Sequence, residues 1–335
     1  MRPAPELEDF LLTQGLAASR HEMRWTPLAG GVSSDIWRVD LPGRTLCLKR
    51  ALPKLKVAAD WFAPIERNVF EWKWLQFAAQ HVPQAVPKPV AHDARAGLFA
   101  MEFLDPEQHP VWKTQLLAGQ VDANVAAAVA RLVVAVHNAS AGDAAVARDF
   151  ATRDNFYALR LEPYLVATGK QHPDLAPKLN ALAERTGAAR IALVHGDVSP
   201  KNILVGPASP ILLDAECAWY GDPAFDIAFC LNHLLLKCLV HPALRAQYLG
   251  AFDAFATTYL GAVRWESAAA IEARATALLP ALLLARVDGK SPVEYLRLEA
   301  DKDLVRRVAR PLVAAGTPTL AGVVQAWRAA LAAGA

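Results

Sequence analysis

Three oxygen-bearing side chains stand at the spacing that phosphoryl transfer requires. Asp197 closes a His-Gly-Asp triplet, Asn202 comes after four further residues, and Asp214 follows another short apolar run. Asp197 can accept a proton from an attacking hydroxyl, and Asn202 and Asp214 offer oxygen ligands that suit Mg²⁺. Since catalysis of phosphoryl transfer is mostly positioning and charge neutralisation, these residues predict a catalytic base next to a metal site.

The segments that carry these residues are short apolar runs bounded by Gly and Pro. Residues 193–194, 203–205 and 211–213 therefore predict short buried strands with polar residues at their ends. The order H-x-D-x-x-x-x-N, followed by D, is the signature of the catalytic and metal loops of kinases. A loop that only caps a turn is the alternative, and the position of all three residues at strand ends favours the catalytic interpretation.

The composition indicates a folded chain with two domains or lobes. The chain has 335 residues, of which 54% are hydrophobic and 20% charged, so it can bury a large core. The net charge of +2 and the pI near 8.3 give no support for a nucleic-acid partner. Four cysteines lack metal-binding spacing and are typical of buried thiols in a reducing compartment: Cys47, Cys217, Cys230 and Cys238.

No segment predicts secretion or a membrane span. The first ten residues carry acidic side chains where a secretory signal would be apolar. Residues 123–139 and 224–240 are apolar, but charged and polar residues interrupt both before the roughly 20-residue length that a span needs. We therefore expect a cytoplasmic protein that does not bind membranes.

The first third of the chain alternates strand-like runs with turn signals. A short helix over residues 5–20 precedes three strands, and an amphipathic helix over residues 65–80 precedes a hairpin. The pattern predicts an antiparallel sheet of about five strands with one inserted helix. The expected strands are residues 25–28, 36–41, 45–48, 90–93 and 98–104.

Lys49 ends the third strand, where a lysine can hold the α- and β-phosphate oxygens of a nucleotide. A lysine at a strand end is more often simply solvated, so this role requires an acidic partner that fixes the ammonium group. The helix over residues 65–80 offers two, of which Glu71 is the first choice and Glu66 the rival.

Two further segments are candidates for contacts with the nucleotide. The loop between the first two strands can turn backbone N–H groups and hydroxyls toward phosphates, although a plain hairpin explains it equally. Where the chain leaves the sheet, the backbone of Glu102 and Leu104 can contact adenine. The loop residues are Gly30, Gly31, Ser33 and Ser34.

The rest of the chain is mainly helical. We expect residues 1–104 to form a nucleotide-binding lobe, and residues 105–335 a helical lobe with the catalytic and metal loops and the acceptor site. The expected helices are residues 121–140, 153–168, 177–189, 226–261, 267–287, 292–308 and 318–333.

Two features near the metal loop support the site rather than perform the chemistry. Asp222 precedes Pro223 and is a good helix cap, and Asp226 can reach back to the backbone amides of the catalytic loop. A polar break at residues 285–292 separates two helices. It is either a plain turn or a segment that packs near the site.

Together these residues resemble the aminoglycoside phosphotransferase and choline kinase-like family of small-molecule kinases. The resemblance covers most of the chain, and its specific parts are H-G-D-x-x-P-x-N and the following D-x-E. Gly196 replaces the arginine that protein kinases usually carry, and Glu216 replaces the glycine of D-F-G. Both changes favour the small-molecule branch. The matching residues are Gly30, Gly31, Lys49, Glu71, 101–104, 195–202, 214–216, 221–223 and Asp226.

The resemblance implies an α+β, bilobal, protein-kinase-like fold that uses ATP and Mg²⁺. It implies Asp197 as catalytic base, Asn202 and Asp214 as magnesium ligands, Lys49 on the phosphates and Glu71 as its orienting partner. Ser199 stands where many members carry a second histidine. Lys201 stands where glycine is common, and it either contacts the γ-phosphate or points to solvent.

The expected function is transfer of the γ-phosphoryl group of ATP to a hydroxyl of an antibiotic, an amino-alcohol or a sugar-like metabolite. A silent nucleotide-binding scaffold and a protein kinase are the alternatives. Retention of the base disfavours the first, and the lack of an A-P-E segment disfavours the second. The acceptor, the choice between ATP and GTP, and the oligomeric state stay open. Several residues either cage a cationic amine or, as we favour, only build helix surface and core: Glu216, Trp219, Tyr220, Asp253, Trp265, Glu266 and Glu272.

Overall fold

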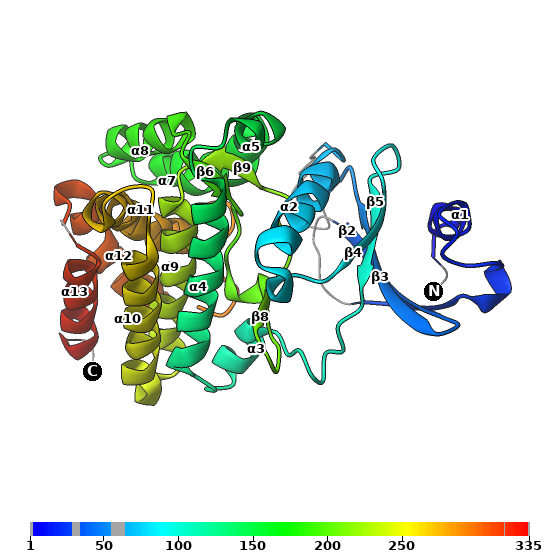
Figure 1. The fold of residues 1–335 in the computed structure, drawn as a ribbon. Helices are drawn as coiled ribbons and strands as arrows, with labels where there is room; N and C mark the ends of the chain where they lie inside the picture. The colour runs from blue at the N-terminus through cyan, green and yellow to red at the C-terminus, as the bar shows by residue number, and fades with distance from the viewer. Residues whose placement is uncertain (1–2, 29–33, 55–63, 318, 334–335) are drawn as a thin grey trace.

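The computed structural model describes residues 3–28, 34–54, 64–317 and 319–333. A strand-rich lobe and a larger helical lobe lie side by side (Figure 1). In the described residues of the first lobe, five strands form one antiparallel sheet in the order β1-β2-β3-β5-β4. The predicted α+β bilobal fold is confirmed. The strands are β1 (Arg24–Pro27), β2 (Ser34–Leu41), β3 (Arg44–Ala51), β4 (Pro89–Asp93) and β5 (Leu98–Glu102).

The two faces of the sheet are covered by different helices. Helix α1 (Pro5–Thr13) lies on the outer side, and α2 (Arg67–His81) lies between the sheet and the helical lobe (Figure 1). Alternate residues of β2 and β3, such as Val39 and Leu48, are buried in a small core with Leu7 of α1. This alternation is the pattern of a strand with two different faces.

Helix α1 is shorter than the helix that we predicted over residues 5–20. It ends at Thr13, and Gly15 adopts a positive φ of 63° that turns the chain. The N–H of Leu16 then donates to the carbonyl of Leu11 across this turn at 2.8 Å. A glycine in this conformation is a common way to end a helix.

The helical lobe is built around α9 (Ala224–Val240), whose residues from Ala224 to Leu239 are all buried. Helices α10 and α11 pack on α9, and α4 packs on α10. The helices of this lobe are α3 (Trp112–Leu117), α4 (Ala123–Ser140), α5 (Ala144–Asp149), α6 (Arg153–Phe156), a π-helical segment (Tyr157–Val166), α7 (Ala167–Gln171), α8 (Ala176–Ala188), α9, α10 (Arg245–Ala262), α11 (Ala268–Asp288), α12 (Glu299–Ala315) and α13 (Leu320–Ala333).

Two predicted helices have different boundaries. The stretch 226–261 is two helices, because Pro242 disfavours a helical backbone at His241. The helix expected over residues 292–308 begins at Glu299 and continues to Ala315. The chain before it folds back on α11, where the N–H of Val293 donates to the carbonyl of Arg286 at 2.9 Å.

Short strands lie next to the segments that contain the candidate catalytic residues, as predicted. Strand β6 (Ala192–Val194) pairs with β9 (Trp219–Gly221), and β7 (Ile203–Val205) pairs with β8 (Pro210–Leu212), both antiparallel. The two pairs of strands set the positions of the loops that follow β6 and β8.

Among the described residues, two helices are long and apolar enough to cross a membrane by length and composition alone, namely α4 and α11. Half of the apolar window of α4 and 61% of that of α11 are buried inside the protein. Burial of this extent against other helices is typical of the core helices of a helical lobe, so the two helices are weak evidence for a membrane span.

Gly196 has a backbone conformation that other residues rarely adopt. Its φ is +78°, and an added Cβ would lie 2.7 Å from the carbonyl oxygen of Cys217. We expect Gly196→Ala to lower the free energy of unfolding by about 1–3 kcal/mol in urea titrations. The matched control is Gly250→Ala in α10, where nothing lies within 4 Å and alanine should stabilise by about 0.5–1 kcal/mol. Equal effects of the two substitutions would contradict this account.

Candidate active site

The catalytic loop is held by a buried carboxylate at the start of α9. Asp226 accepts hydrogen bonds from the backbone N–H groups of His195 at 2.8 Å and Gly196 at 2.9 Å. His137 lies on the other side of this carboxylate, with Nε2 at 3.2 Å from Oδ2. The prediction that Asp226 reaches back to the loop amides is confirmed. Asp222 accepts from the N–H of Ala224 at 3.0 Å and so caps the start of the same helix.

Asp197 lies at the end of this loop between two cations. Its Oδ2 is 2.8 Å from Nη2 of Arg160 and 3.1 Å from Nζ of Lys201. Burial alone would raise the pKa of Asp197, but Arg160 and then Lys201 bring it well below its ordinary value. Asp197 is therefore a carboxylate at neutral pH, as a proton acceptor must be. Lys201 contacts Asp197 although its side chain is half exposed.

The sequence patterns did not identify Arg160. It lies on the π-helical segment Tyr157–Val166, and its Nε donates to the carbonyl of Gly196 at 2.7 Å. The residue fixes both the backbone and the side chain of the catalytic loop. Its sequence neighbourhood is an ordinary amphipathic helix with no motif, so only the folded chain reveals it.

The β7–β8 pair brings the two predicted metal ligands next to the catalytic loop. The N–H of Leu213 donates to the carbonyl of Asn202 at 2.9 Å, which sets Asn202 opposite the residue before Asp214. The Asn202 side-chain amide donates to the carbonyl of Asp197 at 3.2 Å. This bond orients the Asn202 side chain and leaves its oxygen as a possible ligand. Asp197, Asn202 and Asp214 therefore belong to one cluster.

Asp214 has a positive φ of 67°, and within the described residues it is the only non-glycine residue with one. Such a conformation costs about 1–3 kcal/mol and persists where the surrounding structure enforces it. It presents the carboxylate to Lys49 across the two lobes. Strain of this kind at a candidate metal ligand is typical of a functional site.

Lys49 joins the sheet, α2 and the metal loop. Its Nζ lies 2.8 Å from the Glu71 carboxylate and also contacts Asp214. Glu71 is the partner, whereas Glu66 lies exposed at the start of α2. Burial disfavours the ammonium form of Lys49, yet Asp214 and then Glu71 raise its pKa above the ordinary value. The group is therefore a fixed positive charge.

A second buried ion pair connects the lobes beside the first one. Nε of Arg67 in α2 lies 2.9 Å from the carboxylate of Glu216, two residues after Asp214. Arg67 also donates to the carbonyls of Leu52 at 2.7 Å and Pro64 at 2.8 Å. The sequence analysis did not find Arg67, because an arginine in the first turn of a helix has no distinctive signal.

The structure describes only part of the predicted nucleotide contacts. Ser34 begins β2 and is buried. Glu102 ends β5, where its N–H donates to the carbonyl of Lys88 at 2.9 Å. Leu104 follows half buried. The other three loop residues, Gly30, Gly31 and Ser33, lie outside the described residues.

The residues present fit a magnesium site that a nucleotide completes. In the described part of the chain no three His, Cys, Asp or Glu side chains form a metal-binding group of their own. Mg²⁺ is usually held by only one or two protein oxygens together with water and phosphate oxygens. The amide oxygen of Asn202 and the carboxylate of Asp214 are such a pair. The chemistry of the donor set therefore agrees with the predicted ion.

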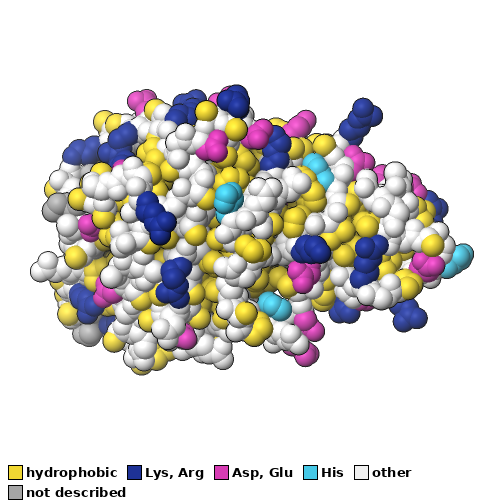
Figure 2. All heavy atoms as spheres, viewed as in Figure 1, with side chains coloured by type: hydrophobic (Ala, Val, Ile, Leu, Met, Phe, Trp, Pro, Cys, Tyr) yellow, Lys and Arg dark blue, Asp and Glu magenta, His cyan; other side chains and the backbone are white. Residues whose placement is uncertain are grey.

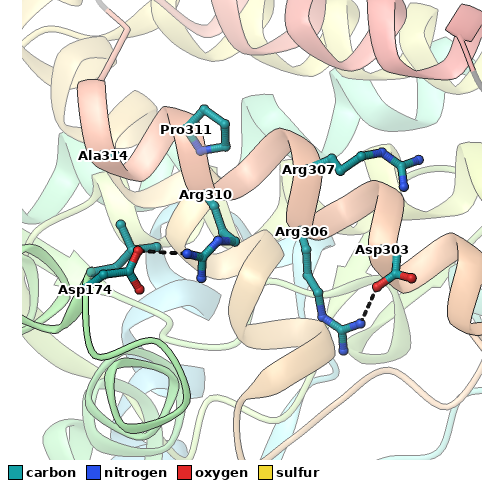
Figure 3. A pocket seen from close by; sticks show the side chains of 8 residues that line it. Asp174, Asp303, Arg306, Arg307, Arg310, Pro311 and Ala314 are labelled. Atoms are coloured by element: carbon teal, nitrogen blue, oxygen red, sulfur yellow. Dashed lines mark hydrogen bonds and ion pairs between the residues drawn. The ribbon is translucent and has the colours of Figure 1, made fainter.

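A groove of about 520 Å³ lies away from this cluster, along α12 and the chain before α8. It is rich in arginine, but Arg310 pairs with Asp174 and Arg306 with Asp303, both at 2.7 Å (Figure 3). The face in Figure 2 shows basic and acidic side chains interspersed over both lobes. In the groove itself, the ion pairs of Arg306 and Arg310 neutralise most of the positive charge within the protein.

The sheet with its Lys49–Glu71 pair, joined to a helical lobe with catalytic and metal loops, defines a protein-kinase-like fold. Residues 24–264 match the model of the phosphotransferase enzyme family, which is the larger part of the chain. The chain belongs to this family. The predicted resemblance to small-molecule kinases is therefore confirmed.

Individual relatives are distant. A methylthioribose kinase of Yersinia enterocolitica is 26% identical in an alignment of 226 positions that covers 59% of this chain and 55% of that protein. The chain thus spans about half the length of this relative. An ethanolamine kinase structure from Plasmodium vivax has a TM-score of 0.58 at 11% identity and covers 95% of this chain and 93% of its own. A choline/ethanolamine kinase family structure from Mesorhizobium loti has a TM-score of 0.54 at 15% identity, with 97% and 99% covered.

Helix α9 carries a fully buried lysine that destabilises the fold at neutral pH. Burial, and then the positive charges of Lys113 and Arg286, lower the pKa of Lys237 to about 7, although Cys230 and Glu294 act in the opposite sense. In the unfolded chain this amine has its ordinary pKa. The unfolded state therefore binds more protons between about pH 7 and pH 10, and stability rises with pH over this range.

We expect Lys237→Met to raise the free energy of unfolding by about 2–4 kcal/mol at pH 7, because the buried amine no longer opposes folding. The gain should shrink steadily as the pH rises toward 10, because the amine of the unfolded chain then approaches its own pKa of 10.5 and begins to lose its proton as well. Urea titrations at several pH values measure it. Lys170→Met at an exposed position is the control, and a gain that does not depend on pH would contradict the assignment.

Proposed function

We propose that this protein transfers the γ-phosphoryl group of ATP to a hydroxyl of a small molecule. One observation carries the proposal. Asp197, Asn202 and Asp214 lie in one cluster, which the ion pair between Lys49 and Asp214 connects to the sheet. Residues 1–104 would hold the nucleotide, and residues 105–335 would supply the base and the acceptor site.

Each residue of the cluster has a task that its surroundings allow. Asp197 orients the acceptor hydroxyl and takes its proton, and Arg160 keeps the carboxylate in place at 2.8 Å. Lys49 binds nucleotide phosphate oxygens while Glu71 holds the ammonium. Asn202 and Asp214 would hold Mg²⁺, which when bound neutralises phosphate charge. Asp214 would then exchange its contact with Lys49 for the ion.

The relatives support a small-molecule acceptor in general terms. Methylthioribose kinase and ethanolamine kinase are named for small hydroxyl compounds. The acceptor of this chain would likewise be a small metabolite or antibiotic, and not a protein, nucleic acid or membrane component. The four cysteines are buried and unpaired, which supports action in the reducing cytoplasm.

The test is removal of the base and of the metal ligand. We expect Asp197→Asn and Asp214→Ala each to lower turnover by roughly 10²-fold or more, since each removes a general-base or electrostatic contribution. ATP consumption in the presence of a panel of antibiotics, amino-alcohols, sugars and hydroxy acids measures the activity.

Asp253→Asn, at an exposed carboxylate of α10, serves as the control and should keep the wild-type rate. Near-normal turnover by both active-site variants would refute the assignment. Magnesium-dependent ATP binding without transfer to any compound of the panel would favour a nucleotide-binding scaffold instead.

A further inference from the structure

One face of α9 leads away from the catalytic base. Phe229, His233 and Lys237 are spaced by four residues and therefore lie along the same side of the helix. The Arg160 guanidinium, which holds Asp197, lies 5.9 Å from the centre of the Phe229 ring. The charge of Asp197 also acts on His233. This face is thus a buried wall next to the catalytic base.

Arg286 lies at the end of α11, and all of its hydrogen-bond partners in the described residues are neutral groups. Its Nη1 donates to the hydroxyl of Tyr164 at 2.9 Å and to the carbonyl of Ser291 at 2.7 Å. Its Nε is buried and has no hydrogen-bond partner. The residue keeps 8% of its surface exposed, so it is not completely sealed from solvent. Its charge acts on the Glu294 carboxylate, but the described residues place no carboxylate in hydrogen-bond contact with it. A nearly buried guanidinium in this situation is costly unless a further negative charge is supplied.

Two more nitrogen-bearing groups on α9 lack a negative partner in the part of the chain that the structure describes. His233 places Nδ1 3.2 Å from the hydroxyl of Tyr295, and its Nε2 is buried without a partner. Lys237 Nζ lies 4.6 Å from the centre of the Tyr295 ring and donates to the carbonyl of His233 at 3.5 Å. Burial and the charge of Arg286 hold the pKa of His233 well below its ordinary value. Tyr295 itself is half buried and joins these groups.

The carboxylates near this wall are already used. Asp197 is bound by Arg160 and Lys201, and Glu294 pairs with Lys113. The guanidinium of Arg286 is therefore the main positive charge beside this wall, because the lowered pKa values of His233 and Lys237 favour loss of their protons. A cationic amine placed here would meet repulsion, whereas an anion would supply the missing counter-charge.

The acidic and aromatic residues that could have formed a cage for an amine are used elsewhere. Glu266 pairs with Arg274 at 2.6 Å, and Glu272 accepts from the N–H of Leu320 at 3.0 Å. They connect helices, in agreement with the interpretation that they build helix surface and core. The polar break at residues 285–292, in contrast, brings Arg286 to the wall.

We propose, on the basis of the proposed function, that the acceptor carries an anionic group in addition to its hydroxyl, and that Arg286 binds this group. A carboxylate or a phosphate matches the planar guanidinium, which can form two parallel hydrogen bonds to such a group. His233 and Tyr295 line the position next to Arg286, and Lys237 lies against the Tyr295 ring. The hydroxyl of the same molecule then lies toward Asp197.

The experiment compares matched ligands that differ only in charge. One set is glycerate, glycerol 3-phosphate, glycerol and 2-amino-1,3-propanediol, and the other is gluconate, sorbitol and glucosamine. Binding is measured by calorimetry on the full chain with Mg²⁺ and a non-hydrolysable ATP analogue. We expect an anionic member of at least one set to bind at least about tenfold more tightly than the matched amine. Glycerate against glycerol 3-phosphate separates a carboxylate from a phosphate.

Substitutions test the role of Arg286 itself. Arg286→Gln should remove the preference for anions by about tenfold, and Arg286→Lys should keep part of it. Lys290→Gln, which removes the same charge four residues away in an exposed pair with Glu162, should change nothing. Thermal unfolding and binding of the ATP analogue show whether each variant is folded with an intact nucleotide site.

The outcomes separate this inference from the proposed function. Equal or tighter binding of the amines, no measurable binding of any anion, or a preference for anions that survives in Arg286→Gln would overturn the inference. Phosphoryl transfer to amines alone would do the same and leave the proposed function intact. Failure to bind the ATP analogue would count against the proposed function, and with it against this deeper assignment.

Discussion

The ammonium group of Lys49, buried between Glu71 and Asp214, is the interaction on which the arrangement of the site depends. The two carboxylates lie 22 and 165 residues away along the chain, on α2 and on the loop after β8. A charge buried to this degree is tolerated only if opposite charges are held next to it. The sheet, α2 and the metal loop must therefore take fixed positions relative to one another. The Arg67–Glu216 pair adds a second connection between the same two elements.

The catalytic loop shows the same dependence on buried polar groups. Asp226 holds its backbone amides, Arg160 holds both a carbonyl and the Asp197 carboxylate, and Gly196 supplies the conformation that lets the loop pass Cys217. Asp214 adopts a strained backbone next to it. A loop that only had to be stable would not need these features. Together they restrict the site to one geometry before any ligand binds, which is what a reaction controlled by positioning requires.

Local patterns were sufficient for much of the fold and part of the site. The alternation of β2 and β3, the apolar runs around the His-Gly-Asp triplet and the turn residues between them predicted the sheet and the short strands. The order of motifs along the chain also placed Lys49, Asp197, Asn202 and Asp214. Asp197, Asn202 and Asp214 could be predicted because each lies next to a short strand, where spacing in the sequence fixes position in space. Lys49 lies within β3, which continues to Ala51, whereas we predicted it at the end of the strand.

Residues that act across large sequence separations were not predictable. Three arginines lie in helical stretches whose sequence has no distinctive motif, namely Arg67, Arg160 and Arg286. Their roles come from partners that the fold brings next to them. Helix ends were also misjudged where a tertiary contact decides them, as in the segment before α12, which folds back on α11. The surroundings of Arg286 belong to this class, since they form only when α9, α11 and the chain after α11 are packed together.

The central claim is that Lys49, Asn202 and Asp214 form a nucleotide site that magnesium completes. Calorimetric titration of the wild-type protein with ATP, with and without Mg²⁺, tests this claim most directly. The account predicts one saturable site with Mg²⁺ and much weaker binding when the ion is removed by a chelator. Absence of ATP binding, or binding of equal strength with and without Mg²⁺, would contradict it.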